Sequence, residues 1–161
     1  MNKEAYATYD ILPNLSYKII ERLMEDENAE IIWKLLKYND KDAYKYNNLT
    51  QKEKAALIYP GGDKQDSYNV YLDFTMDDAT IEEKTFLRIY PAYVLPQNRT
   101  IGICGINFEI LSHTKINHLS NYTTRIDAIT QALLLTLNGT DIGTIGNMYL
   151  DKSISGFDKM Q

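Results

Sequence analysis

The residues of this 161-residue sequence with most catalytic potential are Asp73 and the Glu82-x-Lys84 pair. Two carboxylates can hold a divalent metal such as Mg²⁺ and orient a water molecule, while a nearby lysine stabilises developing negative charge. Alternation along a strand would place Glu82 and Lys84 on the same face. The pattern is compatible with a magnesium-dependent nuclease, but an exposed strand entry with alternating charge gives the same spacing.

Two histidines, one cysteine and a run of glycines are the other residues with chemical potential. His113 and His118 are five apart, with no third ligand at a recognisable metal-binding spacing. Cys104 occupies an apolar strand position without a neighbouring base, which is typical of an unreactive thiol. The glycines within 139–146 follow a helix and lack the lysine of a phosphate loop, so we interpret them as a helix C-cap and strand glycines. We expect no metal site, no cofactor and no nucleophile here.

The composition is that of an ordinary globular chain with an acidic first half. Hydrophobic residues make up 44% and charged residues 24%, and the net charge is −5. Residues 1–83 contain 17 Asp and Glu against 10 Lys and Arg, whereas residues 84–161 contain 5 against 7. No apolar run approaches the roughly 20 residues that span a bilayer, and no signal-peptide pattern begins the sequence. We therefore expect no membrane segment and, without a basic cluster, no tight DNA recognition.

The first third of the chain has the periodicity of short helices. We expect helices at 15–25, 31–36 and 50–57, and an exposed polar loop at 38–49. Asn14 is placed to cap the first helix, and Thr50 and Glu53 fit a capping box at the third. In the second helix, Trp33 falls toward the flank of the apolar stripe.

The rest of the chain alternates between strand and helix periods. We expect strands at 68–74, 85–90, 101–111 and 142–150, and a helix at 122–137 that ends at Asn138-Gly139. The first two strands could pair as an antiparallel hairpin, with Pro91 closing the second strand. The apolar phase of the third strand slips at Cys104-Gly105, and a β-bulge is the simplest explanation.

These elements predict an α+β fold of one domain, 1–161. Short N-terminal helices form a lead at 13–58, and the sheet and long helix occupy 68–150, followed by a tail at 151–161. The sheet is expected to be mostly antiparallel with about four strands, and the long helix to pack across it.

Four sequence features resemble the neck and tail-completion proteins of tailed bacteriophages. They are the strand L-R-I-Y at 87–90, the strand end F-E-I-L-S-H at 108–113, the helix that starts R-I-D at 125 and ends L-N-G before I-G-x-I-G, and I-W-K-L-L-K-Y-N at 32–39. The resemblance implies a structural protein of the virion, made in the host cytoplasm, with no enzymatic activity and no cofactor.

The resemblance further implies a homo-oligomeric ring of six or twelve copies in the phage neck. Such a head-tail connector or tail terminator joins the portal to the tail, contacts neighbouring connector or tail proteins and surrounds DNA without binding it specifically. We expect the subunit contacts in two loops rich in Tyr and Asn: Tyr44 and Tyr46 in one, and Tyr93 and Asn98 in the other. The 13 tyrosines favour protein contacts, although an AT-rich genome gives the same enrichment. The alternatives are the magnesium-dependent nuclease and a small cytosolic adaptor that binds one protein partner.

Overall fold

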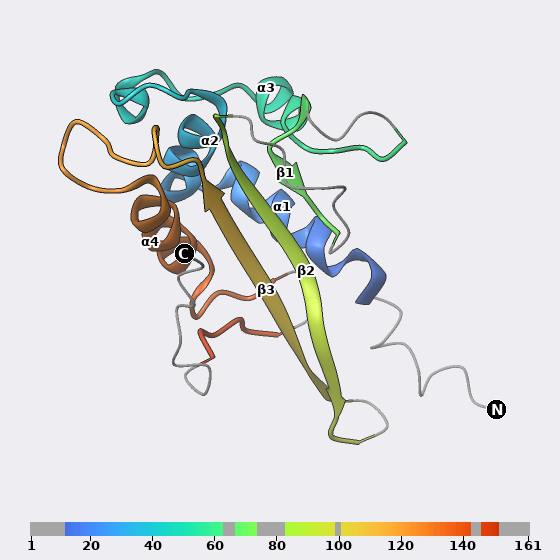
Figure 1. Cartoon of the computed structure of the whole chain (residues 1–161). Coiled ribbons are helices and arrows are strands. Elements are labelled where there is room, and N and C mark those ends of the chain that lie inside the picture. The colour runs from blue at the N-terminus through green and yellow to red at the C-terminus, as the bar shows by residue number, and fades with distance from the viewer. Residues whose placement is uncertain (1–11, 63–66, 74–82, 99–100, 143–145, 152–161) are drawn as a thin grey trace.

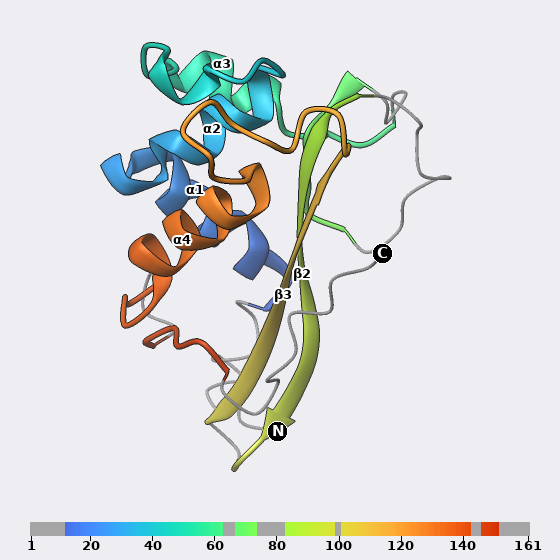
Figure 2. The ribbon, with the colours of Figure 1, turned by 60° about the vertical axis from the view of Figure 1, so that its left-hand side comes forward.

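A computed structural model describes residues 12–62, 67–73, 83–98, 101–142 and 146–151. The fold is α+β, as predicted: a sheet of strands β1 to β3 carries helices α1, α2 and α4 on one face (Figures 1 and 2). The helices are α1 (Leu15–Glu25), α2 (Glu30–Lys37), α3 (Gln51–Ala56) and α4 (Arg125–Leu137), and the strands are β1 (Val70–Tyr71), β2 (Thr85–Pro96) and β3 (Gly102–Ser112).

The local sequence signals predicted the bounds of α3 and α4 closely. The capping box of α3 is formed: the Thr50 side chain accepts from the Glu53 backbone N–H, and the Glu53 carboxylate accepts from the Thr50 N–H. Helix α4 starts at Arg125, three residues later than predicted, because Thr124 caps it by accepting from the Asp127 N–H at 3.1 Å. Beyond α4, Gly139 adopts a φ of 77°, which ends the helix as expected.

Two predictions about the first helices were wrong. Asn14 makes no side-chain capping hydrogen bond, although α1 begins directly after it. Trp33 does not lie on a flank: it is fully buried, and its indole N–H donates to the Leu23 carbonyl at 2.9 Å. Because β2 and α4 pack against α2 and the end of α1 contacts Trp33, the short helix buries a wider face than one apolar stripe indicates.

The sheet has the order β1-β2-β3: its long β2–β3 pair is antiparallel, as predicted, and its short β1–β2 pair is parallel, which makes the sheet mixed. Strand β1 is only two residues long and runs parallel to β2, so the predicted antiparallel hairpin is not formed. Pro91 does not end β2, which continues to Pro96. The fourth strand is also absent from the described residues: 146–151 contains no strand, and Met148 instead folds back on the end of α4, where its N–H donates to the Thr140 carbonyl at 2.9 Å.

The hydrophobic core lies between the sheet and the helices that cover it. Its most buried members come from α1, α2, α4 and the strands β1 and β2, and include Ile19, Leu23, Ile32, Leu36, Val70, Leu87, Ile89 and Ile129. The helices cover only part of the sheet, and the far ends of β2 and β3 extend beyond them (Figures 1 and 2). No helix in the described part of the chain is long and apolar enough to cross a membrane.

Candidate functional site

The most distinctive surface is the outer part of the β2–β3 hairpin, which we call the hairpin arm: Tyr93–Pro96 of β2 and Gly102–Gly105 of β3. The two strands pair antiparallel from Thr85 with Ser112 to Pro96 with Gly102. The register shifts once, between Pro91 and Tyr93 of β2, so Ala92 is the extra residue of a bulge. The predicted bulge therefore exists at this level but lies on the opposite strand, beside a proline that has no N–H to give to the ladder.

The apolar residues of the hairpin change faces at the bulge. Residues that pair across two strands share a face, and Leu87 and Ile89, with their partners on β3, point toward the helical core. On β3, Cys104 and Ile106 also pack toward the core, which places Ile103 and its partner Leu95 on the outer face. The slip in apolar phase thus marks a second apolar surface, not a kink in β3.

This outer apolar surface is open to solvent. Leu95 and Ile103 are each 52% exposed, and Ile101 at the base of the turn is 58% exposed. The hairpin has no charged residue among its described positions from Ile89 to Phe108, in a chain that is 24% charged. A contiguous exposed apolar surface on a projecting hairpin is typical of a protein interface.

The same outer face is polar nearer the middle of the sheet. The Tyr90 hydroxyl donates to the Glu109 carboxylate, which also forms an ion pair with Arg88. Burial, together with the neighbouring carboxylate, raises the pKa of Tyr90. The Asn107 amide lies 3.5 Å from the Tyr90 hydroxyl. The outer face is therefore divided into a partnered polar patch and the unpartnered apolar surface of Leu95 and Ile103.

Tyr93, one of the predicted contact residues, has a structural role within the arm. Its ring lies across Gly105, where an added Cβ would come within 2.3 Å of the Tyr93 Cε1 atom. Its hydroxyl donates to the Asp151 carboxylate at 3.2 Å, which raises the pKa of Tyr93. Gly105 thus makes room for an aromatic side chain that covers the backbone of the neighbouring strand.

The other predicted contact residues are distributed over two parts of the molecule. The Asn98 carboxamide oxygen accepts from the Ile101 N–H at 2.8 Å, so Asn98 helps to close the end of the arm. Tyr44 and Tyr46 lie at and beside the 3₁₀ turn Ala43–Lys45, at the other end of the molecule (Figure 1). The Tyr46 ring packs edge-on against Tyr38, with ring centroids 4.6 Å apart. The structure does not bring the two pairs together, and their contacts with other copies stay predictions.

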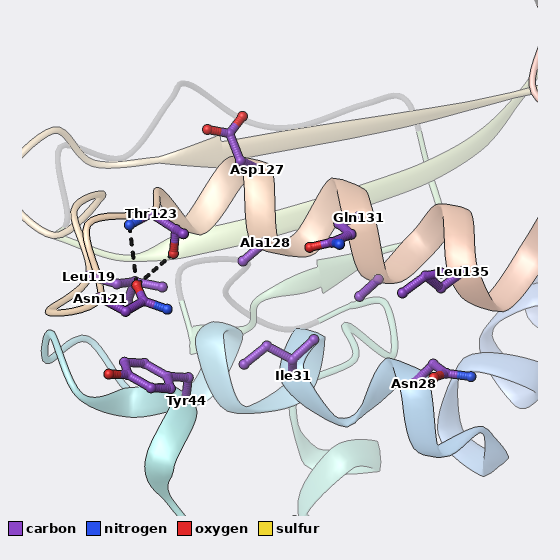
Figure 3. A pocket seen from close by; sticks show the side chains of 11 residues that line it. Asn28, Ile31, Tyr44, Leu119, Asn121, Thr123, Asp127, Ala128, Gln131 and Leu135 are labelled. Carbon is purple, nitrogen blue, oxygen red and sulfur yellow. Dashed lines mark hydrogen bonds between the residues drawn. The ribbon is translucent and has the colours of Figure 1, made fainter.

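A groove between α2 and α4 is a second surface, which the sequence did not indicate. It has a volume of about 330 Å³ and is open to solvent. Ile31 of α2 and Ala128 of α4 form its apolar walls, and Asn121 and Tyr44 close one end (Figure 3). Asp127 is the only formally charged residue that lines it among the described positions.

Tyr122 stands at the Asn121 end of this groove in an unusual conformation. Its φ of 66° lies in the left-handed region, at a cost of about 1–2 kcal/mol for a residue with a Cβ, and its side chain is 98% exposed. Hydrogen bonds hold the loop: the Asn121 carboxamide oxygen accepts from the Thr123 N–H at 3.2 Å and from its hydroxyl at 2.7 Å. No sequence pattern predicts a left-handed tyrosine, and strain of this kind gathers at functional loops.

Arg125 braces the same region from inside. Its guanidinium is fully buried and donates to four backbone carbonyls: Ile116, Leu35, Tyr38 and Asp40, at 2.6 to 2.8 Å. Two of these acceptors, Leu35 and Tyr38, belong to the C-terminal end of α2, whose last carbonyls lack helical partners. Burial lowers the pKa of Arg125. The arginine therefore locks the groove walls together.

The proposed nuclease residues do not gather into a recognisable centre in the described part of the chain. Glu82 lies outside the described residues. Lys84 is buried, and its ammonium group donates to the Tyr68 carbonyl at 3.0 Å. Asp73 follows β1 by two residues. No group of three or more His, Cys, Asp or Glu side chains among the described positions could hold a metal ion.

The histidines and the cysteine are placed at structural positions. The His113 Nδ1 atom accepts from the Lys115 N–H at 3.3 Å just beyond β3, and His118 forms an isolated bridge with Thr124. Cys104 is a free, partly buried thiol on β3, and burial raises its pKa. A raised pKa keeps the thiol protonated, which disfavours nucleophilic chemistry.

The chain matches a known family over most of its length. The model of the YomW family covers residues 29–161, a range that includes α2, the sheet, the hairpin arm and α4. Neither a curated protein nor a solved structure matches the chain.

Proposed function

This chain belongs to the YomW family, a phage-derived family, and on that premise we propose that it is a structural protein of the virion. It forms a homo-oligomeric ring in the phage neck, as a head-tail connector or tail terminator. The ring joins the portal to the tail and aligns the channel through which DNA passes.

The observation that carries the proposal is the exposed apolar surface of the hairpin arm. A ring subunit needs surfaces that contact the next copy, and such surfaces are apolar in their centre and depleted in charge. The outer face formed by Leu95 and Ile103 has both properties and projects beyond the helices. The same surface supports contacts with a neighbouring portal, connector or tail protein.

The net negative charge of the chain also supports a position in the wall of the DNA channel. A net charge of −5 gives a ring an overall negative potential, and a negative lumen repels phosphate. DNA then slides through the ring without binding to it.

The test is the location of the protein in purified phage particles. We expect mass spectrometry to find it at a constant ratio to the portal, and a small tag at its C-terminus to place electron-dense label at the neck. Phage that encode the Leu95→Asp/Ile103→Asp variant should accumulate separate heads and tails, whereas Tyr17→Asp, on an exposed position of α1, should assemble normally. Purified particles that contain portal but none of this protein would overturn the proposal.

A further inference from the structure

The hairpin arm and the α2–α4 groove have matching chemistry. We propose that the arm of one copy docks into the groove of the next copy, with the Tyr122 ring covering one end of the contact. This inference rests on the proposed ring and names the two surfaces that would build it.

Both surfaces are nearly free of formal charge. The described arm has no charged side chain, and the groove has a single one, Asp127, on its edge. The groove floor is apolar, and Asn28 and Gln131 supply neutral amides at the rim (Figure 3). An uncharged apolar ridge can enter such a groove without stripping water from an unpaired charge.

The dimensions of the two surfaces also agree. From Tyr93 to Pro96 the arm advances by three residues, or about 10 Å at about 3.3 Å per strand residue. From Asp127 to Leu135 the groove wall advances by eight residues, or about 12 Å at 1.5 Å per helical residue. The exposed part of the arm therefore fits the length of the groove.

The positions of the two surfaces favour a ring. The groove lies on the helical layer, which consists of α1, α2 and α4, whereas the arm extends past that layer (Figure 2). A contact between two different surfaces is heterologous, and its repetition produces a closed ring or an open filament. An arm-to-arm contact would instead stop at a dimer.

Tyr122 is prepared for such a contact before it forms. Its side chain is fully in solvent while its backbone is held: the Tyr122 N–H donates to the Leu119 carbonyl at 3.2 Å, and the Leu119 N–H donates to the Thr123 carbonyl at 2.9 Å. Little backbone ordering is then needed on docking, and tyrosine is enriched at the energetic centres of interfaces.

Cysteine cross-linking tests the pairing directly. In a Cys104→Ser background, Leu95→Cys places a thiol on the arm and Gln131→Cys places one at the groove. With a short bismaleimide, the double variant should give a ladder of multimers, and a mixture of the two single variants should give dimers. Each single variant alone should give none, as should Leu95→Cys combined with Tyr17→Cys. Dimers from Leu95→Cys alone, or no ladder from the double variant, would overturn the proposal.

Mixing experiments give an independent readout. The arm variant Leu95→Asp/Ile103→Asp keeps an intact groove, and the groove variant Tyr122→Gly/Leu135→Asp keeps an intact arm. We expect each to be monomeric alone and the mixture to form one-to-one dimers in sedimentation velocity. Tyr122→Gly alone relieves the backbone strain, so it should fold normally yet weaken association at least tenfold. Wild-type association of Tyr122→Gly would remove Tyr122 from the interface.

The two proposals fail separately. If the protein occupies the neck of purified particles but bismaleimide gives no arm-to-groove product, the docking is wrong and the structural role stands. If the ladder forms with purified protein but particles lack it, the neck role is wrong and the docking stands as self-association.

Discussion

The helical layer and the hairpin arm differ in the side chains that are costly for a folded protein: buried polar groups in the layer and exposed apolar groups in the arm. In the helical layer the two largest side chains with buried donors are paired: Trp33 and Arg125 are buried and donate their described hydrogen bonds to backbone carbonyls. In the arm, Leu95 and Ile103 are half exposed without need of any polar partner. These two side chains find their partners within one chain, whereas the arm exposes apolar area that a second protein surface could bury.

This difference separates stability from assembly. Substitutions in the helical layer should lower the free energy of unfolding, because they leave buried groups without partners. Substitutions of the exposed Leu95 and Ile103 on the outer face of the arm should leave that free energy unchanged and act on association. Variants of the two regions test this division, and the largest loss of stability is expected in the helical layer.

Arg125→Met should cause the largest loss of stability, about 4 kcal/mol, and could prevent folding at 37 °C. The substitution removes four hydrogen bonds; the Asp40 carbonyl keeps its bond from the Ala43 N–H at 3.3 Å, but each buried carbonyl left without a donor costs about 1–3 kcal/mol before relaxation. Urea unfolding followed by circular dichroism measures the loss. Arg22→Met, which removes only a part-exposed ion pair with Asp26, should cost less than about 1 kcal/mol. Similar values for the two variants would contradict the bracing role of Arg125.

Lys54→Met should lower the free energy of unfolding by about 3 kcal/mol. Lys54 is buried, forms an ion pair with Glu30 and donates to the Met24 carbonyl at 2.8 Å, so its removal strands a nearly buried carboxylate. Lys54→Met/Glu30→Met removes both charges and should recover part of the loss in the same urea experiment. A double variant less stable than Lys54→Met would show that the carboxylate is not the cause.

Gly105→Val should destabilise the arm by about 1–2 kcal/mol, because its Cβ cannot share space with the Tyr93 ring. The effect should be local, so hydrogen exchange of β2 and β3 amides beyond Ala92 is the appropriate measurement. Tyr93→Ala/Gly105→Val should restore protection, since the smaller side chain clears the site. Faster exchange throughout α4 would instead show that the arm is coupled to the core.

Acid should weaken the start of α3 through Glu53. The hydrogen bond from Lys37, with further hydrogen bonds from Thr50, lowers the pKa of Glu53 from 4.5 to about 2. A carboxyl whose folded pKa is depressed stabilises the fold above the unfolded pKa, and the contribution is lost between about pH 4.5 and pH 2. Thermal unfolding of wild type and Glu53→Gln should therefore converge as pH falls through this window. A constant difference down to pH 2 would contradict the assignment.

Local sequence signals predicted what local structure determines. The Thr50 and Glu53 pattern predicted the capping box, and Asn138-Gly139 predicted the end of α4, because each feature depends on a few adjacent residues. The burial of Trp33 and the parallel pairing of β1 depend on contacts between distant segments, which periodicity does not contain.

The candidate site was predicted only in part. The slip in the apolar pattern at Cys104-Gly105 correctly indicated where along the hairpin the arm begins. The same slip is expected from a bulge in β3 or from apolar residues on both faces of a regular strand. Only the register of β2 against β3 distinguishes the two. Tyr93 was chosen for its loop and proved to belong to a strand. Tyr122 gave no signal, since its left-handed backbone runs against the preference of its residue type.

Sedimentation velocity of the wild type and of Leu95→Asp/Ile103→Asp over a range of concentrations tests the central claim most directly. We expect the wild type to form a concentration-dependent ring-sized species and the variant to remain monomeric, while urea unfolding of the two agrees within about 0.5 kcal/mol because the positions are exposed. Association of the variant equal to that of the wild type would contradict the claim that the outer face of the arm is the contact between copies.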